Sequence, residues 1–471
     1  MHANLETLQL PDFGLPTIEP EIPAVLYRLR VEQLCTRARA EGFSHMVVYA
    51  DREHFANLAY LTGYDPRFEE ALLILDLRTG SSSRPKLLVG NEGVGYVRVS
   101  PIIEDLEVVL FQSFSLLGQP RGSSVPLTEI LHSAGIGPGA RIGTAGWKHF
   151  SPREAQHPDL LLEIPSYIAD TLREAVGSRE AVRNANAILM DSQTGLRTIN
   201  EPEQLARFEF VGSHSSQAIR NVLFNLKPGM TELEAVTLMR LNGLPFSCHL
   251  MLSAGERAWL GMGSPSMRRM KQGDAFTAAC GLWGTLTCRA GFLVENESGF
   301  PKGIRDYLDR LVVPYFEAVA AWYERVGIGI RGDELYRSVH DRIGEPFFGV
   351  TLNPGHLVHL DEWVNSPIYK GSPETLRSGM ALQVDVIPAT GGAYFTTNIE
   401  DGILLADEPL RAEIASRHPE AWLRIQERRR FMTETLGIRL RPEVLPLSNI
   451  PAYLPPYLLA PRRAMRLTNK F

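Results

Sequence analysis

The stretch GDAFTAACGLWGTLTCRAGFLV (residues 273–294) is the most informative part of this chain. It lies in a region, Phe246 to Val294, that we expect to be rich in strands. Its one acidic residue is Asp274, and no acid follows from Ala275 through Val294. Metal sites that hold hard cations use carboxylate oxygens. The stretch therefore supplies no such ligand after Asp274, and the meaning of this absence depends on the segments around it.

The overall composition is that of a globular protein with more than one domain. A chain of 471 residues with 44% hydrophobic content can build two or more sizeable cores. A net charge of −6 gives no reason to expect nucleic acid as a partner. Four cysteines without CxxC or zinc-type spacing favour a reduced, cytoplasmic location. Without a long apolar run or a signal-like start, we expect no membrane association.

The order of helical and strand-like segments predicts two domains and a C-terminal arm. Residues 1–194 alternate helices and strands and read as a first domain. Residues 195–441 read as a second domain, in which Thr231 and Glu234 form a Thr-x-x-Glu capping box. Residues 442–471 are rich in Pro and Leu, and we expect an irregular arm there.

Several motifs resemble those of a known superfamily. They are LKPGMTELEA (226–235), the stretch 273–294, PGHLVHLDEW (354–363), SGMALQVDVIP (378–388) and NIEDGILL (398–405). Together they resemble the pita-bread superfamily of methionine and Xaa-Pro aminopeptidases, prolidase and creatinase. ANLAYLTGYDPRFEEALLIL (56–75) resembles the N-terminal domain of creatinase and prolidase, read as a strand that ends at a glycine. The resemblance implies a mixed α/β (α+β) protein, with a creatinase-like N-terminal domain before a pita-bread domain, and a homodimer.

The resemblance also implies where metal ligands would stand. Metallopeptidases of this superfamily use two aspartates, one histidine and two glutamates. The histidine position is His356, and the two glutamate positions are Asp385, one methylene shorter, and Glu400. The first aspartate position falls on Ala279, and the second falls on Leu286 or Cys288. We therefore expect no dinuclear site and no cofactor, with a single divalent metal at His356, Asp385 and Glu400 as the alternative.

Creatinase is the metal-free comparison within this superfamily. Its acid/base histidine stands a dozen residues before the Gly-Asp pair, which corresponds to about Gly261 here. No histidine occurs at that position, and the nearest one is His249. His249 is therefore a candidate for a displaced acid/base or substrate-binding group, with a structural histidine as the alternative.

The remaining polar residues of the motifs supply a candidate active site. His356 with Glu362 would form an acid/base pair, since a carboxylate orients an imidazole and raises its basicity. If the segment is extended, His359 faces the opposite way, so only one histidine need face the cleft. Asp385 and Glu400 lie in apolar strands, where an isolated buried charge is too costly without a partner. A polar network without catalytic function is the alternative.

Two residues of the 273–294 stretch complete the candidates. Arg289 could clamp a substrate carboxylate or form a structural ion pair. Cys288 could be a nucleophile or ordinary core packing.

These residues predict a metal-independent, creatinase-like hydrolase that cleaves a C–N bond of a small polar substrate. His356 would be the acid/base, with Glu362, Asp385 and Glu400 as further catalytic residues. Arg289, His359 and His249 would bind the substrate. The alternatives are an Xaa-Pro aminopeptidase-like peptidase with one metal and a non-catalytic binding protein that retains the fold.

Overall fold

The computed structural model describes residues 2–78, 83–259 and 261–468, and the chain separates into two compact units. Residues 22–197 form the smaller unit, and residues 1–21 with 198–471 form the larger. The sequence assigned the first 21 residues to the N-terminal domain, whereas here they group with the larger unit. The reason is their pairing with the C-terminal residues, described below.

The smaller unit is a mixed sheet covered by helices. Within the described residues its sheet has the order β5-β4-β3-β2-β6-β7. The strands are β2 (His45–Ala50), β3 (Ala71–Asp76), β4 (Lys86–Val89), β5 (Glu107–Leu110), β6 (Ile142–Ala145) and β7 (Val182–Asn184). The helices are α1 (Ala24–Ala40), α2 (Ala56–Thr62), α3 (Gly93–Tyr96), α4 (Leu127–Ser133), α5 (Ser166–Val176) and α6 (Ala187–Met190). Side chains of β2, β3 and β4 pack against α4 and α5 in one core, in agreement with the predicted α/β class.

One segment of this unit differs from the prediction. The residues before Gly63 form helix α2 rather than a strand. Gly63 ends this helix with φ +70°, and a Cβ there would lie 2.6 Å from Cδ of Pro101. A left-handed glycine is a common helix terminator, which the apolar run before it did not reveal.

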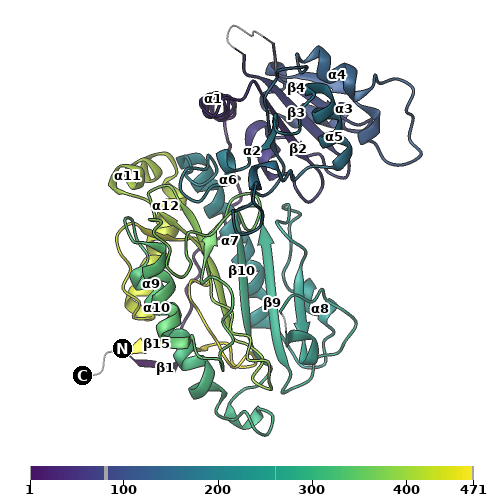
Figure 1. The fold of residues 1–471 in the computed structure, drawn as a ribbon. Helices are drawn as coiled ribbons and strands as arrows, with labels where there is room; N and C mark the ends of the chain where they lie inside the picture. Colours follow the sequence, from purple (N-terminus) through teal and green to yellow (C-terminus); the bar gives the residue numbers. More distant parts are fainter. Residues whose placement is uncertain (1, 79–82, 260, 469–471) are drawn as a thin grey trace. The chain divides into compact units, whose positions relative to one another are not determined.

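The larger unit is built on an antiparallel sheet, in which β9 and β10 are long neighbouring strands (Figure 1). Its order in the described residues is β11-β12-β13-β10-β9-β8, with β14 paired to β13. The strands are β8 (Met251–Ala254), β9 (Ala275–Leu282), β10 (Thr285–Phe292), β11 (His356–Leu357), β12 (Ala381–Asp385), β13 (Asn398–Leu405) and β14 (Val444–Pro446). The stretch 273–294 thus forms the hairpin β9–β10, and Gly284 at its turn has φ +127°. A Cβ on Gly284 would meet Phe208 at 2.3 Å, so the turn and the helix beside it require glycine.

Helices cover this sheet. They are α7 (Pro202–Asn225), α8 (Glu232–Thr237), α9 (Val313–Arg325), α10 (Gly332–Ile343), α11 (Glu408–Arg417) and α12 (Pro419–Arg430). Helix α7 contacts β9 and β10 along their length, as Figure 1 shows. Pro202 occupies the first turn of α7, where its missing N–H costs nothing. The capping box of Thr231 and Glu234 is present at the start of α8, as predicted.

The C-terminal arm is more regular than its composition suggested. Residues 442–471 contain β14 and β15 (Arg463–Thr468). Strand β15 pairs antiparallel with β1 (His2–Thr7), with His2 opposite Thr468. Ala464, Met465 and Leu467 of this arm are buried. The prediction of an irregular arm was therefore wrong for these strands, because their pairing partners lie far away in the sequence.

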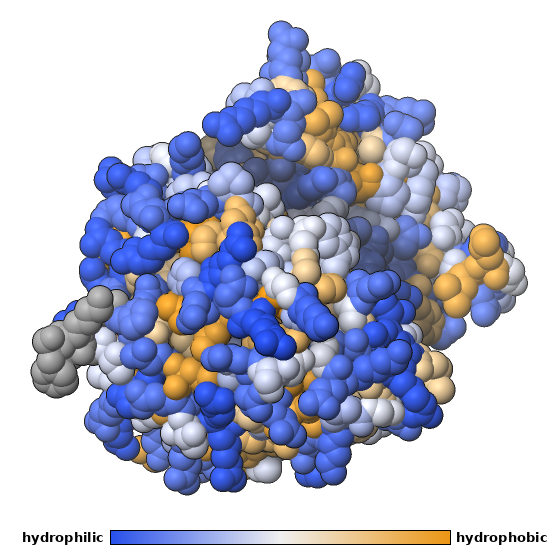
Figure 2. Space-filling view, turned by 90° about the horizontal axis from the view of Figure 1, so that it is seen from below, coloured by the Kyte–Doolittle hydropathy of each residue, from blue (hydrophilic) through white to orange (hydrophobic). Residues whose placement is uncertain are grey.

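The face shown in Figure 2 is mostly hydrophilic, with hydrophobic residues gathered in small patches. Across residues 2–78, 83–259 and 261–468, every helix is too short or too polar to span a membrane.

Candidate active site

One row of side chains crosses the antiparallel sheet of the larger unit. Strand pairing places Asp385 opposite Glu400, Glu400 opposite Cys288, Cys288 opposite Ala279, and Ala279 opposite Met251. Directly opposed residues of neighbouring strands point to the same face of a sheet. The register therefore brings five segments of sequence, which span residues 251 to 400, to one line on one face.

A cavity of about 310 Å³ opens over this row. All five residues of the row line it. The other lining residues are Cys248, His249, Trp259, Gly261, Met262, Thr277, Leu286, Leu352, Glu362, Trp363, Ile387, Pro388, Ala389, Thr396 and Asn398. Apolar walls with a few convergent polar groups are typical of small-molecule sites.

The acids of the row are strongly perturbed. Burial raises the pKa of Glu400 well above its ordinary value, and the charge of Asp385 raises it further. Burial also raises the pKa of Asp385, while a hydrogen bond from Glu400 and the charge of His356 oppose that rise. In this pair Glu400 is the protonated donor and Asp385 the acceptor. Two carboxyl groups that share a proton can act as acid and base in one site.

His356 lies beneath the cavity rather than in its wall. Its Nε2 is 3.1 Å from Oε1 of Glu362 and 3.9 Å from Oδ2 of Asp385. The Trp363 ring stacks on the imidazole with centroids 4.0 Å apart, and His356 is fully buried. Burial lowers the pKa of His356, but Glu362 and Asp385 together outweigh it and raise the pKa above its ordinary value. The structure thus joins the predicted residues His356, Glu362, Asp385 and Glu400, with His356 behind the acids.

The two other histidines lie in different places. His359 is buried outside the cavity lining, where its Nδ1 accepts a hydrogen bond from the Leu360 N–H. Its ring meets Phe208 edge-on at 5.3 Å. A substrate-binding role for His359 is therefore corrected to packing between the sheet and α7. His249 does line the cavity, and its Nε2 is 3.0 Å from the carbonyl oxygen of Met262.

Arg289 faces away from the cavity. It directly follows Cys288 on β10, and successive residues of a strand point to opposite faces. Its guanidinium is buried and pairs with Asp401 at 2.7 Å. Its other donors reach the carbonyl oxygens of Tyr453, Cys288, Glu400 and Ile450. The predicted clamp on a substrate carboxylate is therefore corrected to a structural ion pair.

The donor set does not fit a dinuclear metal site. The resemblance puts the two aspartate positions at Ala279 and at either Leu286 or Cys288, and all three side chains line the cavity. Burial raises the pKa of Cys288 to about 12, which disfavours the free thiolate that a nucleophile needs. Within the described ranges, no group of three His, Cys, Asp or Glu residues is arranged to hold a metal ion.

Three lining residues were not singled out from the sequence. Asn398 donates from Nδ2 to Sγ of Cys288 at 3.3 Å, and Thr277 Oγ1 lies 3.8 Å from the same sulfur. Asn398 stands two residues before Glu400, and Thr277 stands two residues before Ala279. Counting by the two-residue period of a strand would have found both. Trp363, which covers His356, directly follows Glu362 in the quoted motif.

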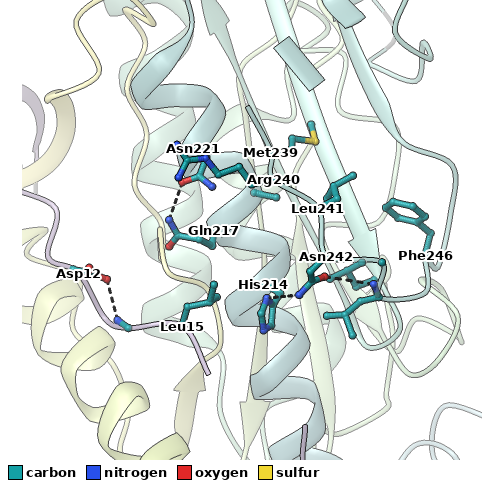
Figure 3. Close-up of a pocket in the computed structure, with 15 residues that line it drawn as sticks. Asp12, Leu15, His214, Gln217, Asn221, Met239, Arg240, Leu241, Asn242 and Phe246 are labelled. Atoms are coloured by element: carbon teal, nitrogen blue, oxygen red, sulfur yellow. Dashed lines mark hydrogen bonds between the residues drawn. The ribbon is translucent and has the colours of Figure 1, made fainter. Parts of the chain in front are cut away.

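A second cavity of about 290 Å³ lies beside α7, away from this row (Figure 3). His214 of α7 points to Asn242, with its Nδ1 3.0 Å from Nδ2 of the amide, and Gln217 donates to Asn221. These polar groups satisfy one another, and no acid pair faces this cavity among its described lining residues. This second cavity therefore offers no group, among its described lining residues, to which we assign a catalytic role.

Comparison with known proteins supports the fold. No family model matches the chain. A Bacillus subtilis (strain 168) protein described as uncharacterized peptidase YqhT is 25% identical over 227 residues. That match covers 46% of this chain and 62% of the relative, which is less than two thirds of its length.

Solved structures match over a longer stretch. The prolidase from Pyrococcus horikoshii OT3 superposes with a TM-score of 0.60 at 16% identity, covering 80% of this chain and 95% of that one. Dipeptidase PepE from Mycobacterium ulcerans gives 0.59 at 15% identity, covering 82% and 95%. The X-Pro aminopeptidase from Thermotoga maritima MSB8 gives 0.59 at 14% identity, covering 80% and 95%. The chain therefore has the fold of prolidases and X-Pro aminopeptidases, the pita-bread fold that its sequence motifs predicted.

Proposed function

We propose that this protein is a peptidase-type hydrolase that cleaves an amide C–N bond of a small substrate in the β8–β13 cavity. The observation that carries the proposal is the hydrogen-bonded pair of Asp385 and Glu400 facing that cavity. The likeness in fold to prolidases and Xaa-Pro peptidases favours a peptide-like amide over the guanidine or urea substrate that the creatinase comparison suggested.

The carboxyl pair can carry the protons of such a hydrolysis. Ionised Asp385 accepts a proton from water as the water oxygen bonds to the amide carbon. Protonated Glu400 donates its proton to the amide nitrogen as the C–N bond breaks. The proton then passes from Asp385 to Glu400 through their hydrogen bond, and the pair is restored. The products are a carboxylic acid and an amine.

His356 acts in this proposal as a positioning residue. Its imidazole next to Asp385 opposes the rise in the pKa of that carboxyl, and Glu362 and Trp363 fix its ring. This assignment differs from the sequence-based one, which made His356 the acid/base itself. The difference follows from its burial beneath Glu362 and Trp363.

Amide hydrolysis by purified variants tests the proposal. Glu400→Gln removes the proton donor and should lower kcat by about 10²–10⁴-fold on any amide that the wild type cleaves. Glu295→Gln, an exposed acid of the same unit, is the matched control. His356→Gln should raise the pKa of Asp385 and so move the acidic limb of the pH–rate profile to higher pH. Wild-type levels of activity in Glu400→Gln would refute the role of the pair.

Metal dependence separates this proposal from its alternative. We expect turnover to survive chelation, because the chain's own acids carry the protons. Activity that needs an added divalent ion, and ion binding that His356→Ala abolishes, would instead assign a single-metal Xaa-Pro peptidase.

A homodimer, implied by the resemblance, is tested by light scattering of the purified protein.

A further inference from the structure

We infer that the cavity over Asp385 and Glu400 selects apolar substrates that carry no carboxylate: amides with a hydrophobic group and either a free amine or no charge. The inference rests on the proposed function in so far as the ligand is called a substrate. The preference itself is argued from the residues that line the cavity.

Apart from His249, the described lining holds three acids and no strong base. Glu362, Asp385 and Glu400 face the cavity, and none of its described lining residues is a lysine or an arginine. The nearest strand cation, Arg289, is fully engaged with Asp401 and backbone carbonyls on the other face. A substrate carboxylate entering the cavity would lose its hydration and meet acids whose one close basic partner, His356, is already shared by Glu362 and Asp385. An ammonium group would meet partners of opposite charge.

The mouth of the cavity is apolar to an unusual degree for an exposed surface. Large hydrophobic side chains remain exposed there: Trp259 (47%), Met262 (64%), Leu352 (49%) and Trp363 (40%). Contiguous exposed apolar residues mark binding sites, because burying them against a ligand recovers about 25 cal/mol per Å². Indole rings such as that of Trp259 also attract cations. The rim thus favours a hydrophobic group and tolerates an amine beside it.

Binding of three matched ligands tests the inference without any turnover. We expect calorimetry to show that 2-phenylethylamine and 3-phenylpropanamide bind at least tenfold more tightly than 3-phenylpropanoate. Met262→Arg adds a cation at the exposed rim. It should reduce the ratio of the affinity for the amine or amide to the affinity for the carboxylate by tenfold or more. Leu423→Arg is the matched control, since Leu423 is similarly exposed (63%) but lies on α12. Its ratio should equal that of the wild type.

The outcomes distinguish this inference from the proposed function. Equal binding of all three ligands, no binding of any, or an unchanged ratio in Met262→Arg would overturn the inference. Preferential binding of the amine and amide, with no amide of the same class cleaved, would support the inference and remove the proposed function. Cleavage of peptides with free carboxylates as fast as of their amides would support the proposed function and overturn the inference.

Discussion

The pKa values of two buried glutamates in the larger unit shift in opposite directions. Glu209 is buried, but Arg424 and Arg428 more than offset that burial and lower its pKa. Glu400 is equally hidden, but its nearest titratable partner is another acid, and its pKa is raised. A fold that can neutralise one buried acid with two arginines has left the other uncompensated. Such a cost is typical of active sites.

This contrast predicts a stability gain on removing the Glu400 carboxyl. Its pKa in the folded state exceeds the unfolded value of about 4.3. Its favourable contribution is therefore complete at low pH and is lost as pH rises through the folded-state pKa. The Glu400→Gln side chain does not titrate. The free energy of unfolding of this variant at pH 7 should therefore exceed that of the wild type by on the order of 1–4 kcal/mol. Urea unfolding at several pH values measures the difference.

The gain should shrink as pH falls toward 4, where both side chains are neutral. Glu295→Gln should show no such dependence. A Glu400→Gln protein that is less stable than the wild type at pH 7 would mean that the carboxyl is compensated after all.

At the scale of elements, a buried ionic cluster joins α7 to α12. Arg428 of α12 donates from Nη1 to Glu209 of α7 at 2.7 Å and from Nη2 to Ser213. Its Nη2 also donates to Oδ1 of Asn449, in the segment after β14. Three chain segments therefore depend on one guanidinium, and this cluster holds α12 against the helix that supports β9 and β10.

We expect Arg428→Met to lower the free energy of unfolding by about 3–5 kcal/mol, because it leaves Glu209 short of a buried partner. Arg430→Met, two residues further on an exposed site, is the matched control. Chemical denaturation compares the two. A loss that is equal in both variants would show that the buried pair contributes nothing special.

At the scale of the whole molecule, a strand near the start of the chain pairs with a strand near its end. Strands β1 and β15 pair over six residues each, from His2 with Thr468 to Thr7 with Arg463. Met465 of β15 is fully buried, and its N–H donates to the carbonyl oxygen of Leu454. The pairing explains why residues 1–21 group with residues 198–471.

Met465→Ala should lower the free energy of unfolding by about 2–5 kcal/mol, as expected for a large-to-small change in a packed site. Arg462→Ala, on an exposed neighbour, should change it by less than about 0.5 kcal/mol. Thermal or urea unfolding measures both. A negligible effect of Met465→Ala would mean that this ribbon is not part of the cooperative core.

Local pattern was enough for much of this protein. The Thr-x-x-Glu box predicted the start of α8, and the resemblance of the quoted motifs implied the pita-bread fold. The motifs also named Asp385 and Glu400, because acids in apolar strands stand out in the sequence itself. These features depend on residues close together in the chain, where side-chain direction follows a short period.

Only the tertiary structure decided how those residues meet. The sheet register set Asp385 beside Glu400 and Cys288 beside Ala279, and it turned Arg289 toward Asp401. Burial placed His356 beneath the acids rather than among them. The two ends of the larger unit pair across more than 450 residues of sequence. Pairing over such separations depends on the packing of the whole sheet, which no local periodicity encodes.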